Sequence, residues 1–129
     1  MAQAVRERLG EDPADLILPV PLHPTRLRER TFNQALGLAQ EMARQLNLPC
    51  LKHLLIRVKP TRPQAELSRN ERLANLHEAF RIQPDPRVRR SRILLIDDVF
   101  TTGATAEACT NLLKQAGASA VIVVTVAHG

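Results

Sequence analysis

The stretch RILLIDDVFTTGAT, residues 92–105, places two adjacent carboxylates directly after four apolar residues, and a threonine-rich turn follows at once. The run Ile93–Ile96 has the continuous apolar pattern that is typical of a strand buried on both faces. In an open α/β sheet, ligands bind at the carboxyl ends of the strands, and Asp97 and Asp98 follow directly on such an end. We therefore expect this stretch to determine both the fold and the functional site.

The turn after the two carboxylates has the composition of an anion-binding loop. Gly103 permits a close approach to the backbone, and Thr101, Thr102 and Thr105 offer hydroxyl donors. The amino end of a following helix would add backbone amides and the positive end of its dipole, which suit a phosphate. The alternative is an Asp helix cap with a tight turn, but a cap needs one acceptor only. The loop would bind a phosphate, and the carboxylate pair beside it would accept hydrogen bonds from a diol. The two together predict that a sugar phosphate binds at an exposed strand end.

Four apolar runs predict the strands of a parallel sheet covered on both faces: Leu16–Val20, Leu54–Val58, Ile93–Ile96 and Ala120–Val126. Three-to-four spacing of apolar residues predicts helices over 33–46 and 105–116, with Gly117 as a stop signal. This order of strands and helices favours an α/β fold with right-handed crossovers. Residues 1–15 predict a short helix or a frayed arm. The charged segment 59–78, which begins with two prolines, predicts a functional loop with a short helix near 70–77.

Composition points to one soluble domain over residues 1–129. No apolar run approaches the roughly 18 residues of a membrane span, and the amino terminus has no signal-peptide core. We therefore expect a cytoplasmic protein without membrane insertion. Cys50 and Cys109 lie far apart and outside any CxxC pattern, so neither a zinc site nor a disulfide framework is indicated. Both cysteines are predicted to be small buried residues.

The net charge of +5 comes mostly from arginines within residues 26–30 and 57–92. The planar fork of an arginine suits phosphates, so an anionic ligand or a nucleic acid is a reasonable partner. A solvated basic surface is the alternative, and charge alone does not decide between the two. Three Phe and no Trp or Tyr leave few platforms for stacking single-stranded bases.

The segment ILLIDDVFTTGAT, residues 93–105, resembles the phosphoribosyl-diphosphate (PRPP) binding motif of the type I phosphoribosyltransferases. The resemblance implies that Asp97 and Asp98 contact the ribose 2′- and 3′-hydroxyls. It also implies that the loop around the 5′-phosphate is formed by Thr101, Thr102, Gly103, Ala104 and Thr105.

Two further segments, PVPLHPTRLRERTFNQA (19–35) and KPTRPQAELSRNERLANLHEAF (59–80), resemble the ComF family of competence-associated, phosphoribosyltransferase-like proteins. With the PRPP motif, the similarity covers residues 16 to 127 and implies the type I phosphoribosyltransferase fold with a mainly parallel central sheet. ComF proteins usually begin with a cysteine-rich zinc-binding segment, which this sequence lacks. We therefore expect either a short member of the family or a trimmed one.

The loop after the first strand matches the position of the pyrophosphate loop of this fold. The resemblance implies that a diphosphate is met there by Leu22, His23, Arg26 and Arg28. The alternative is a proline-rich turn with solvated arginines.

Segment 59–66 resembles the start of the flexible catalytic loop, which closes over PRPP and excludes water. Lys59 and Arg62 would then meet the diphosphate as catalytic residues. The alternative is a mobile surface flap.

The resemblance implies phosphoribosyl transfer from PRPP, with Mg²⁺ bound through PRPP rather than directly by the protein, to an unidentified acceptor in DNA uptake. No general base and no acceptor-binding hood are evident in the sequence, so the question of catalysis stays open. The alternative is a non-catalytic PRPP-binding accessory protein that handles single-stranded DNA in natural transformation. Expected partners are PRPP and either single-stranded DNA or competence proteins. The sequence leaves the oligomeric state open, a homodimer included.

Overall fold

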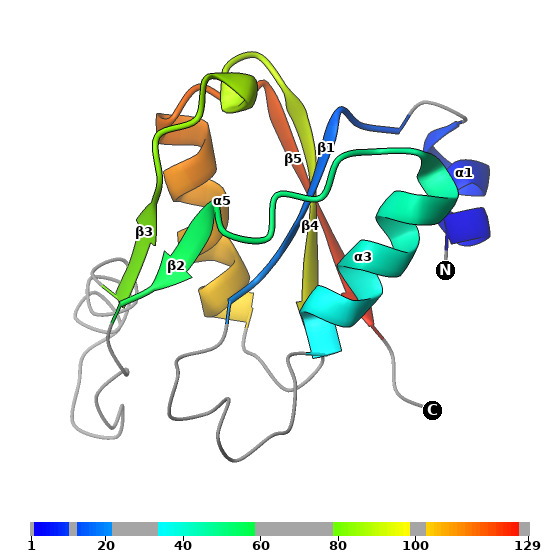
Figure 1. Ribbon diagram of the computed structural model, residues 1–129, viewed down its shortest axis with the longest axis horizontal. Helices are drawn as coiled ribbons and strands as arrows, with labels where there is room; N and C mark the ends of the chain where they lie inside the picture. Colours follow the sequence, from blue (N-terminus) through cyan, green and yellow to red (C-terminus); the bar gives the residue numbers. More distant parts are fainter. Residues whose placement is uncertain (1, 11–12, 22–33, 59–78, 99–102, 127–129) are drawn as a thin grey trace.

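The computed structural model describes residues 2–10, 13–21, 34–58, 79–98 and 103–126, and these form a layered α/β arrangement (Figure 1). The elements in chain order are α1 (Ala2–Leu9), β1 (Leu16–Pro19), α3 (Gln34–Leu46), β2 (Leu55–Arg57), β3 (Phe80–Ile82), the 3₁₀ turn η1 (Pro86–Val88), β4 (Arg92–Asp98), α5 (Gly103–Gln115) and β5 (Ala120–Val126).

The central sheet has the order β1-β4-β5, and both pairings are parallel. Its register runs from Leu16 opposite Ile93 to Pro19 opposite Ile96 on one side of β4. On the other side, all seven residues of β4 pair with β5. The predicted strands at 16–20, 93–96 and 120–126 and the α/β class are therefore confirmed.

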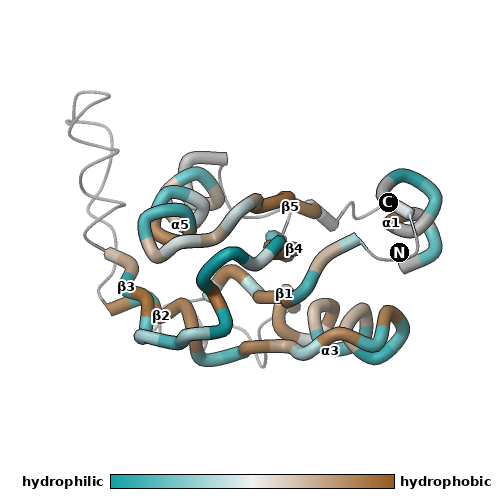
Figure 2. Tube along the Cα trace, turned by 90° about the horizontal axis from the view of Figure 1, so that it is seen from above, coloured by the Kyte–Doolittle hydropathy of each residue, from teal (hydrophilic) through white to brown (hydrophobic). Residues whose placement is uncertain are grey.

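Each face of this sheet carries its own apolar cluster, because successive residues of a strand point to opposite faces. Leu94 and Ile96 pack with α1 and α3, together with Ile17 of β1. Ile93 and Leu95 pack with α5 and with the β2–β3 pair. Figure 2 shows the apolar strands between these two groups of elements, with α3 on one side and α5 on the other. Burial on both faces explains the continuous apolar pattern of β4.

Both long helices end in a residue with a left-handed backbone conformation. Asn47 has φ 57° and follows α3, and the amide of Leu48 donates to the carbonyl of Ala43 at 2.9 Å. Gly117 has φ 108° and follows α5, with the matching bond from Ala118 to Leu113 at 3.1 Å. Such bonds satisfy carbonyls that the helix leaves open. The stop signal at Gly117 and both predicted helices are confirmed, and α5 begins two residues earlier than expected.

The predicted strand Leu54–Val58 does not belong to the parallel sheet, and this part of the prediction is wrong. Its residues 55–57 pair antiparallel with β3, which the sequence did not reveal, and the two strands form a separate sheet. The outer edge of β1 is instead met by the preceding segment, where Ile17 donates to the carbonyl of Pro49 and Leu51 donates to that of Ile17, each at 3.0 Å. A turn at residues 52–54 then leads the chain away from the sheet and into β2.

A polar contact joins β1 to β4 at their amino ends. Asp15 accepts from the backbone amide of Arg92 at 2.8 Å and from its guanidinium, with Nη2 at 3.2 Å. The amide of Asp15 donates in return to the carbonyl of Arg92 at 2.8 Å. These bonds hold the two strands in register at the end opposite their carboxyl ends.

Candidate functional site

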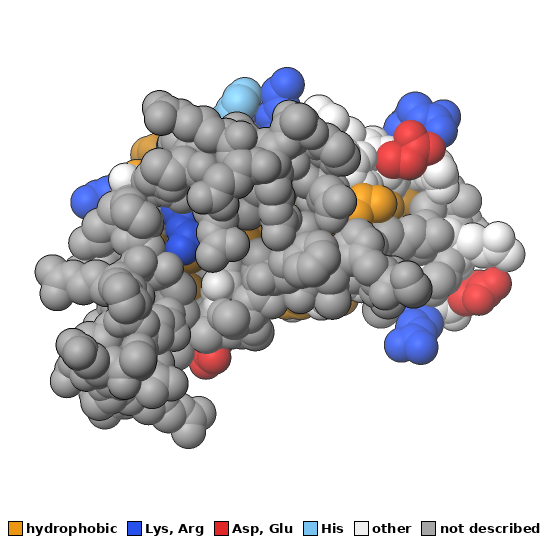
Figure 3. Space-filling view, turned by 90° about the horizontal axis from the view of Figure 1, so that it is seen from below, with side chains coloured by type: hydrophobic (Ala, Val, Ile, Leu, Met, Phe, Trp, Pro, Cys, Tyr) orange, Lys and Arg blue, Asp and Glu red, His pale blue; other side chains and the backbone are white. Residues whose placement is uncertain are grey.

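The carboxyl ends of β1 and β4 meet at one edge of the sheet, because the two strands run parallel. β4 ends at Asp98, and α5 begins at Gly103 beside the same edge. The two flanks of the predicted phosphate loop therefore lie at the edge where ligands bind in open α/β sheets. Figure 3 views the molecule from this side, where described side chains of both charges are visible around the rim.

Asp97 is almost completely buried, with 3% of its surface exposed. It lies opposite Thr125 of β5 and on the same face of β4 as Ile93 and Leu95. That face is covered by α5 and by the β2–β3 pair, so the expectation that both carboxylates stand at an exposed strand end is wrong for Asp97. A buried carboxylate is costly unless it is compensated, and a chain keeps one where a ligand or a network uses it.

Thr105, in the first turn of α5, is the second buried polar residue of the motif, with 6% of its surface exposed. Gly103 and Ala104 precede it as the first helical residues. The first turn of a helix directs backbone amides that have no partner within the helix, and a positive partial charge, toward its amino end, and both suit an anion. Among the described residues, Asp97 and Thr105 are the two polar or charged side chains that are buried.

The pKa of the Cys109 thiol shows which charges lie near the buried side of the β4–α5 junction. This pKa is raised to about 12, mainly by burial and in part by the negative charge of Asp97, while the positive charge of Arg57 opposes the increase. The side chain of Cys109 is fully buried in the cluster beneath α5. Asp97 and Arg57 therefore bring opposite charges to the surroundings of one buried thiol.

Arg57 is a residue that the sequence did not single out as part of the site. It is the last residue of β2, and its guanidinium lies over the ring of Phe80, 5.3 Å from the centroid. Such an arrangement is favourable for a cation on an aromatic face. The signal for Arg57 in the sequence was its place directly before the predicted catalytic loop, but its pairing partner Phe80 lies 23 residues further along the chain.

The remaining predicted site residues are only partly covered by the structure. The backbone of Asp98 closes β4 opposite Val126. The other candidates lie outside the described residues: Leu22, His23, Arg26, Arg28, Lys59, Arg62, Thr101 and Thr102. The expected short helix near 70–77 lies outside them as well.

Two wider properties concern the described part of the chain only. None of its helices is long and apolar enough to cross a membrane. In the same residues, no group of three or more His, Cys, Asp or Glu side chains is gathered as a metal site would require. Cys109 is buried as predicted, whereas Cys50 is only partly buried.

The family model described as "Phosphoribosyl transferase domain" matches residues 33–129, about three quarters of the chain. The chain belongs to this family. The matched residues include β4, the carboxylate pair and α5, whereas β1, which ends at the same edge, precedes the matched part of the chain.

Among curated proteins, the chain is 38% identical over 104 residues to Competence protein F of Haemophilus influenzae, a match that covers 80% of this chain and 45% of that protein. It is 36% identical over 118 residues to DNA utilization protein YhgH of Escherichia coli, covering 92% of this chain and 51% of that protein. A third relative is Competence protein ComFC of Streptococcus pneumoniae, 35% identical over 100 residues, with 77% and 41% covered. The predicted ComF resemblance is confirmed. The chain spans about half the length of these relatives.

A solved structure with the same fold is that of the allosteric regulatory enzyme of purine biosynthesis. The TM-score is 0.57 at 19% sequence identity, and the match covers 96% of this chain and 24% of that one. At this identity the likeness concerns the fold alone. Together with the family match over residues 33–129, this likeness confirms the predicted phosphoribosyltransferase fold.

Proposed function

We propose that the chain binds PRPP at the carboxyl edge of its parallel sheet and transfers the phosphoribosyl group to an acceptor that is not yet identified. The observation that carries the proposal is the burial of Asp97 and Thr105 on either side of the β4–α5 junction. A phosphoribosyltransferase needs an acceptor of hydrogen bonds for the ribose and a donor set for the 5′-phosphate. These two residue types, at these two positions, meet both needs.

Asp97 would accept hydrogen bonds from a ribose hydroxyl, and bonds to a buried charged group are among the stronger ones in proteins. Thr105 and the first amides of α5 would receive the 5′-phosphate at the positive end of the helix dipole. Arg57 would add a cation close to the ribose and the diphosphate, held in place by the ring of Phe80. In the transfer itself, the bond between ribose C1 and the diphosphate oxygen breaks, and a bond from C1 to the acceptor forms.

The residues of this edge are compatible with Mg²⁺ that arrives together with PRPP. Magnesium prefers oxygen ligands and is usually bound by one or two carboxylates together with substrate phosphates. The ion would be held by PRPP itself, and the Asp97 carboxylate would act on it through bound water rather than as a direct ligand. When bound, the ion would neutralise charge on the departing diphosphate.

The names of the relatives, competence protein and DNA utilization protein, support a role in the uptake or use of DNA. A second candidate function follows from the same names and from the net charge of +5. In this case the chain binds PRPP without turnover and assists the handling of single-stranded DNA.

Titration calorimetry with PRPP and Mg²⁺ tests the site. We expect the Asp97→Asn/Asp98→Asn variant to lose about 10- to 100-fold in affinity for each charged hydrogen bond removed. Glu41→Gln, which removes an exposed carboxylate of α3, is the matched control and should bind as the wild type does. Equal PRPP affinity of the wild type and the double variant would refute the proposal.

Release of diphosphate separates the two functions. Turnover with a base, a nucleoside or a nucleic acid identifies the enzyme and its acceptor class. PRPP binding without turnover on any of them favours the accessory role. Single-stranded DNA binding that persists at moderate salt supports that role, whereas binding lost with rising salt reflects only the net charge.

A further inference from the structure

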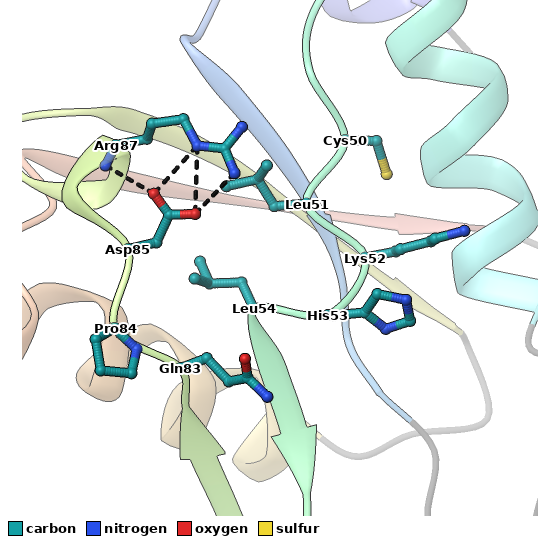
Figure 4. A pocket seen from close by; sticks show the side chains of 9 residues that line it. All are labelled: Cys50, Leu51, Lys52, His53, Leu54, Gln83, Pro84, Asp85 and Arg87. Atoms are coloured by element: carbon teal, nitrogen blue, oxygen red, sulfur yellow. Dashed lines mark hydrogen bonds and ion pairs between the residues drawn. The ribbon is translucent and has the colours of Figure 1, made fainter.

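A pocket of about 370 Å³ lies between two segments that the PRPP site does not use. One wall is the loop 50–54 that leads into β2, and the other is the segment 83–87 that follows β3 (Figure 4). The amide of Gln83 donates to the carbonyl of Leu54 at 2.8 Å and joins the two walls.

This pocket and the carboxyl edge lie at opposite ends of the β2–β3 pair. Leu55 opposite Ile82 is the pairing next to the pocket, and Arg57 opposite Phe80 is the pairing next to the site of Asp97. Segment 83–87 also precedes the amino end of β4, whereas Asp97 is near its carboxyl end. The pocket is therefore separate from the site described above.

The pocket combines an apolar wall with polar groups that point to an anion. Leu51, Leu54 and Pro84 supply the apolar surface, and Leu54 is buried. The polar lining consists of Lys52, His53, Gln83, Asp85 and Arg87. Two of these are cations, one from each wall, and a single carboxylate opposes them.

Arg87 is held in place by that carboxylate. Its Nη2 lies 2.8 Å from Asp85 Oδ2, its Nε lies 3.1 Å from Oδ1, and its backbone amide donates to Oδ1 at 2.9 Å. The hydrogen bonds from Arg87 also lower the pKa of Asp85, so the pair stays ionised at neutral pH. The bonds to Asp85 use Nε and Nη2 of Arg87 but not its Nη1. On the other wall, Lys52 is exposed and carries an ammonium group. The lining thus has a net positive charge and a cation whose orientation is already set.

We propose that this pocket binds a phosphomonoester that carries one ring system, a ligand of mononucleotide size. A phosphomonoester has a charge of about −1.5 to −2 at pH 7. The guanidinium of Arg87 is held at one wall, and Lys52, an exposed lysine whose side chain extends away from Arg87 in Figure 4, can turn to add a second cation. The ring would lie against the leucines and Pro84, with the amide of Gln83 able to donate and accept at its edge. Small-ligand pockets span roughly 300–1,000 Å³, so 370 Å³ suits a single nucleotide better than a dinucleotide.

An occupant of this pocket holds together the two segments that enter β2 and leave β3. The pair consists of three residues on each strand, and such a short two-stranded sheet gains stability mainly from what packs on it. The ligand therefore stabilises the strand that carries Arg57, and a second site acts on the first through this two-stranded sheet.

Amide-resolved NMR of the full chain, titrated with AMP at 150 mM salt, tests the proposal. We expect shifts at residues 51–54 and 83–87, and we expect the same shifts in the Asp97→Asn/Asp98→Asn background, where ribose phosphate binding at the carboxyl edge is disabled. Lys52→Ala and Arg87→Ala should each weaken AMP binding at the pocket at least tenfold. Lys114→Ala and Arg44→Ala are the matched controls, because the first removes an exposed lysine and the second an ion-paired arginine elsewhere. Adenosine and inorganic phosphate should each bind much more weakly than AMP.

Three results would overturn the proposal. The first is the absence of AMP-induced shifts at the two walls. The second is an equal loss of affinity in the variants and their controls, which would assign the binding to net charge. The third is binding of a 5′-phosphorylated oligonucleotide at the pocket without binding of AMP, which would assign the phosphate to a nucleic-acid end. Failure of PRPP binding at the carboxyl edge leaves the shifts at 51–54 unaffected, so the two proposals fail separately.

Discussion

Replacing Asp15 with asparagine tests the contact that joins β1 to β4 at their amino ends. The Asp15 carboxylate accepts from the amide, the Nε and the Nη2 of Arg92, at 2.8, 3.3 and 3.2 Å. Asparagine keeps the shape and one acceptor oxygen, so the backbone bond can persist while the ionic component is removed. Alanine removes both.

The exposure of the pair limits the effect. The side chains of Asp15 and Arg92 are 46% and 40% exposed, and exposed ion pairs contribute about 0.2–1 kcal/mol. We expect Asp15→Asn to lower the free energy of unfolding by about 0.5–1 kcal/mol because this pair has several bonds in a fixed geometry. Asp15→Ala also loses a backbone acceptor, which adds about 0.5–1.5 kcal/mol.

The pH dependence separates charge from shape. The hydrogen bonds from Arg92 lower the pKa of Asp15 below its usual 3.8. A lowered folded-state pKa stabilises the protein above the unfolded-state pKa, and this stabilisation is lost as the pH falls through the folded-state value. Urea unfolding of wild type and Asp15→Asn should therefore differ at pH 7 and converge as the pH falls below 3.8 and through the lowered pKa of Asp15. If the difference in the free energy of unfolding between wild type and Asp15→Asn is the same at pH 7 and in acid, or is larger in acid, the charge is not the cause.

Three further predictions concern the helices and the core. Gly117→Ala should lower the free energy of unfolding by about 1–3 kcal/mol, because Gly117 has φ 108° and a Cβ there would meet an arginine side chain at 3.3 Å. Gly37→Ala is the matched control inside α3 and should raise the free energy of unfolding by about 0.5–1 kcal/mol, since its Cβ meets nothing within 4 Å. Equal changes in the free energy of unfolding for the two variants, measured in urea, would contradict both expectations. The two thiols should react differently with a thiol reagent at pH 9. Cys109 is buried and has a pKa of about 12, so it should react only after unfolding, whereas the partly buried Cys50 should react slowly in the native protein. Rapid reaction of both thiols in the native protein would refute this prediction. Leu94→Ala, at a fully buried position of β4, should cost about 2–5 kcal/mol in thermal or urea unfolding, and a loss below about 1 kcal/mol would mean that the core is misassigned.

The parallel sheet could be predicted because its strands are long enough, or buried enough, to leave a continuous apolar pattern. β4 and β5 have seven residues each, and β4 is buried on both faces. The β2–β3 pair could not be predicted in the same way, since three residues per strand show no periodicity. The partner of β2 also lies beyond the segment 59–78, and nothing local specifies that pairing.

The candidate site was predictable where chemistry is local and missed where it depends on packing. Asp97, Thr105 and the start of α5 follow one another in a single stretch, so their joint position at the strand end could be inferred from order alone. The burial of Asp97 could not be inferred, because it depends on which elements cover the α5 face of β4. Arg57 was missed for the same reason: its position is set by Phe80 and by the antiparallel pairing of β2.

The contact at Asp15 bears on the site although it lies at the other end of the sheet. Shifting a strand by one residue against its neighbour moves its side chains to the opposite face. In the observed register Pro19 lies opposite Ile96, so β1 ends level with the residue before Asp97. A one-residue slip of β4 would place Asp97 on the face of α3 and remove it from α5, Cys109 and the charge of Arg57. The bonds between Asp15 and Arg92 disfavour that slip from a distance, and the position of the buried carboxylate is therefore determined at both ends of the strand.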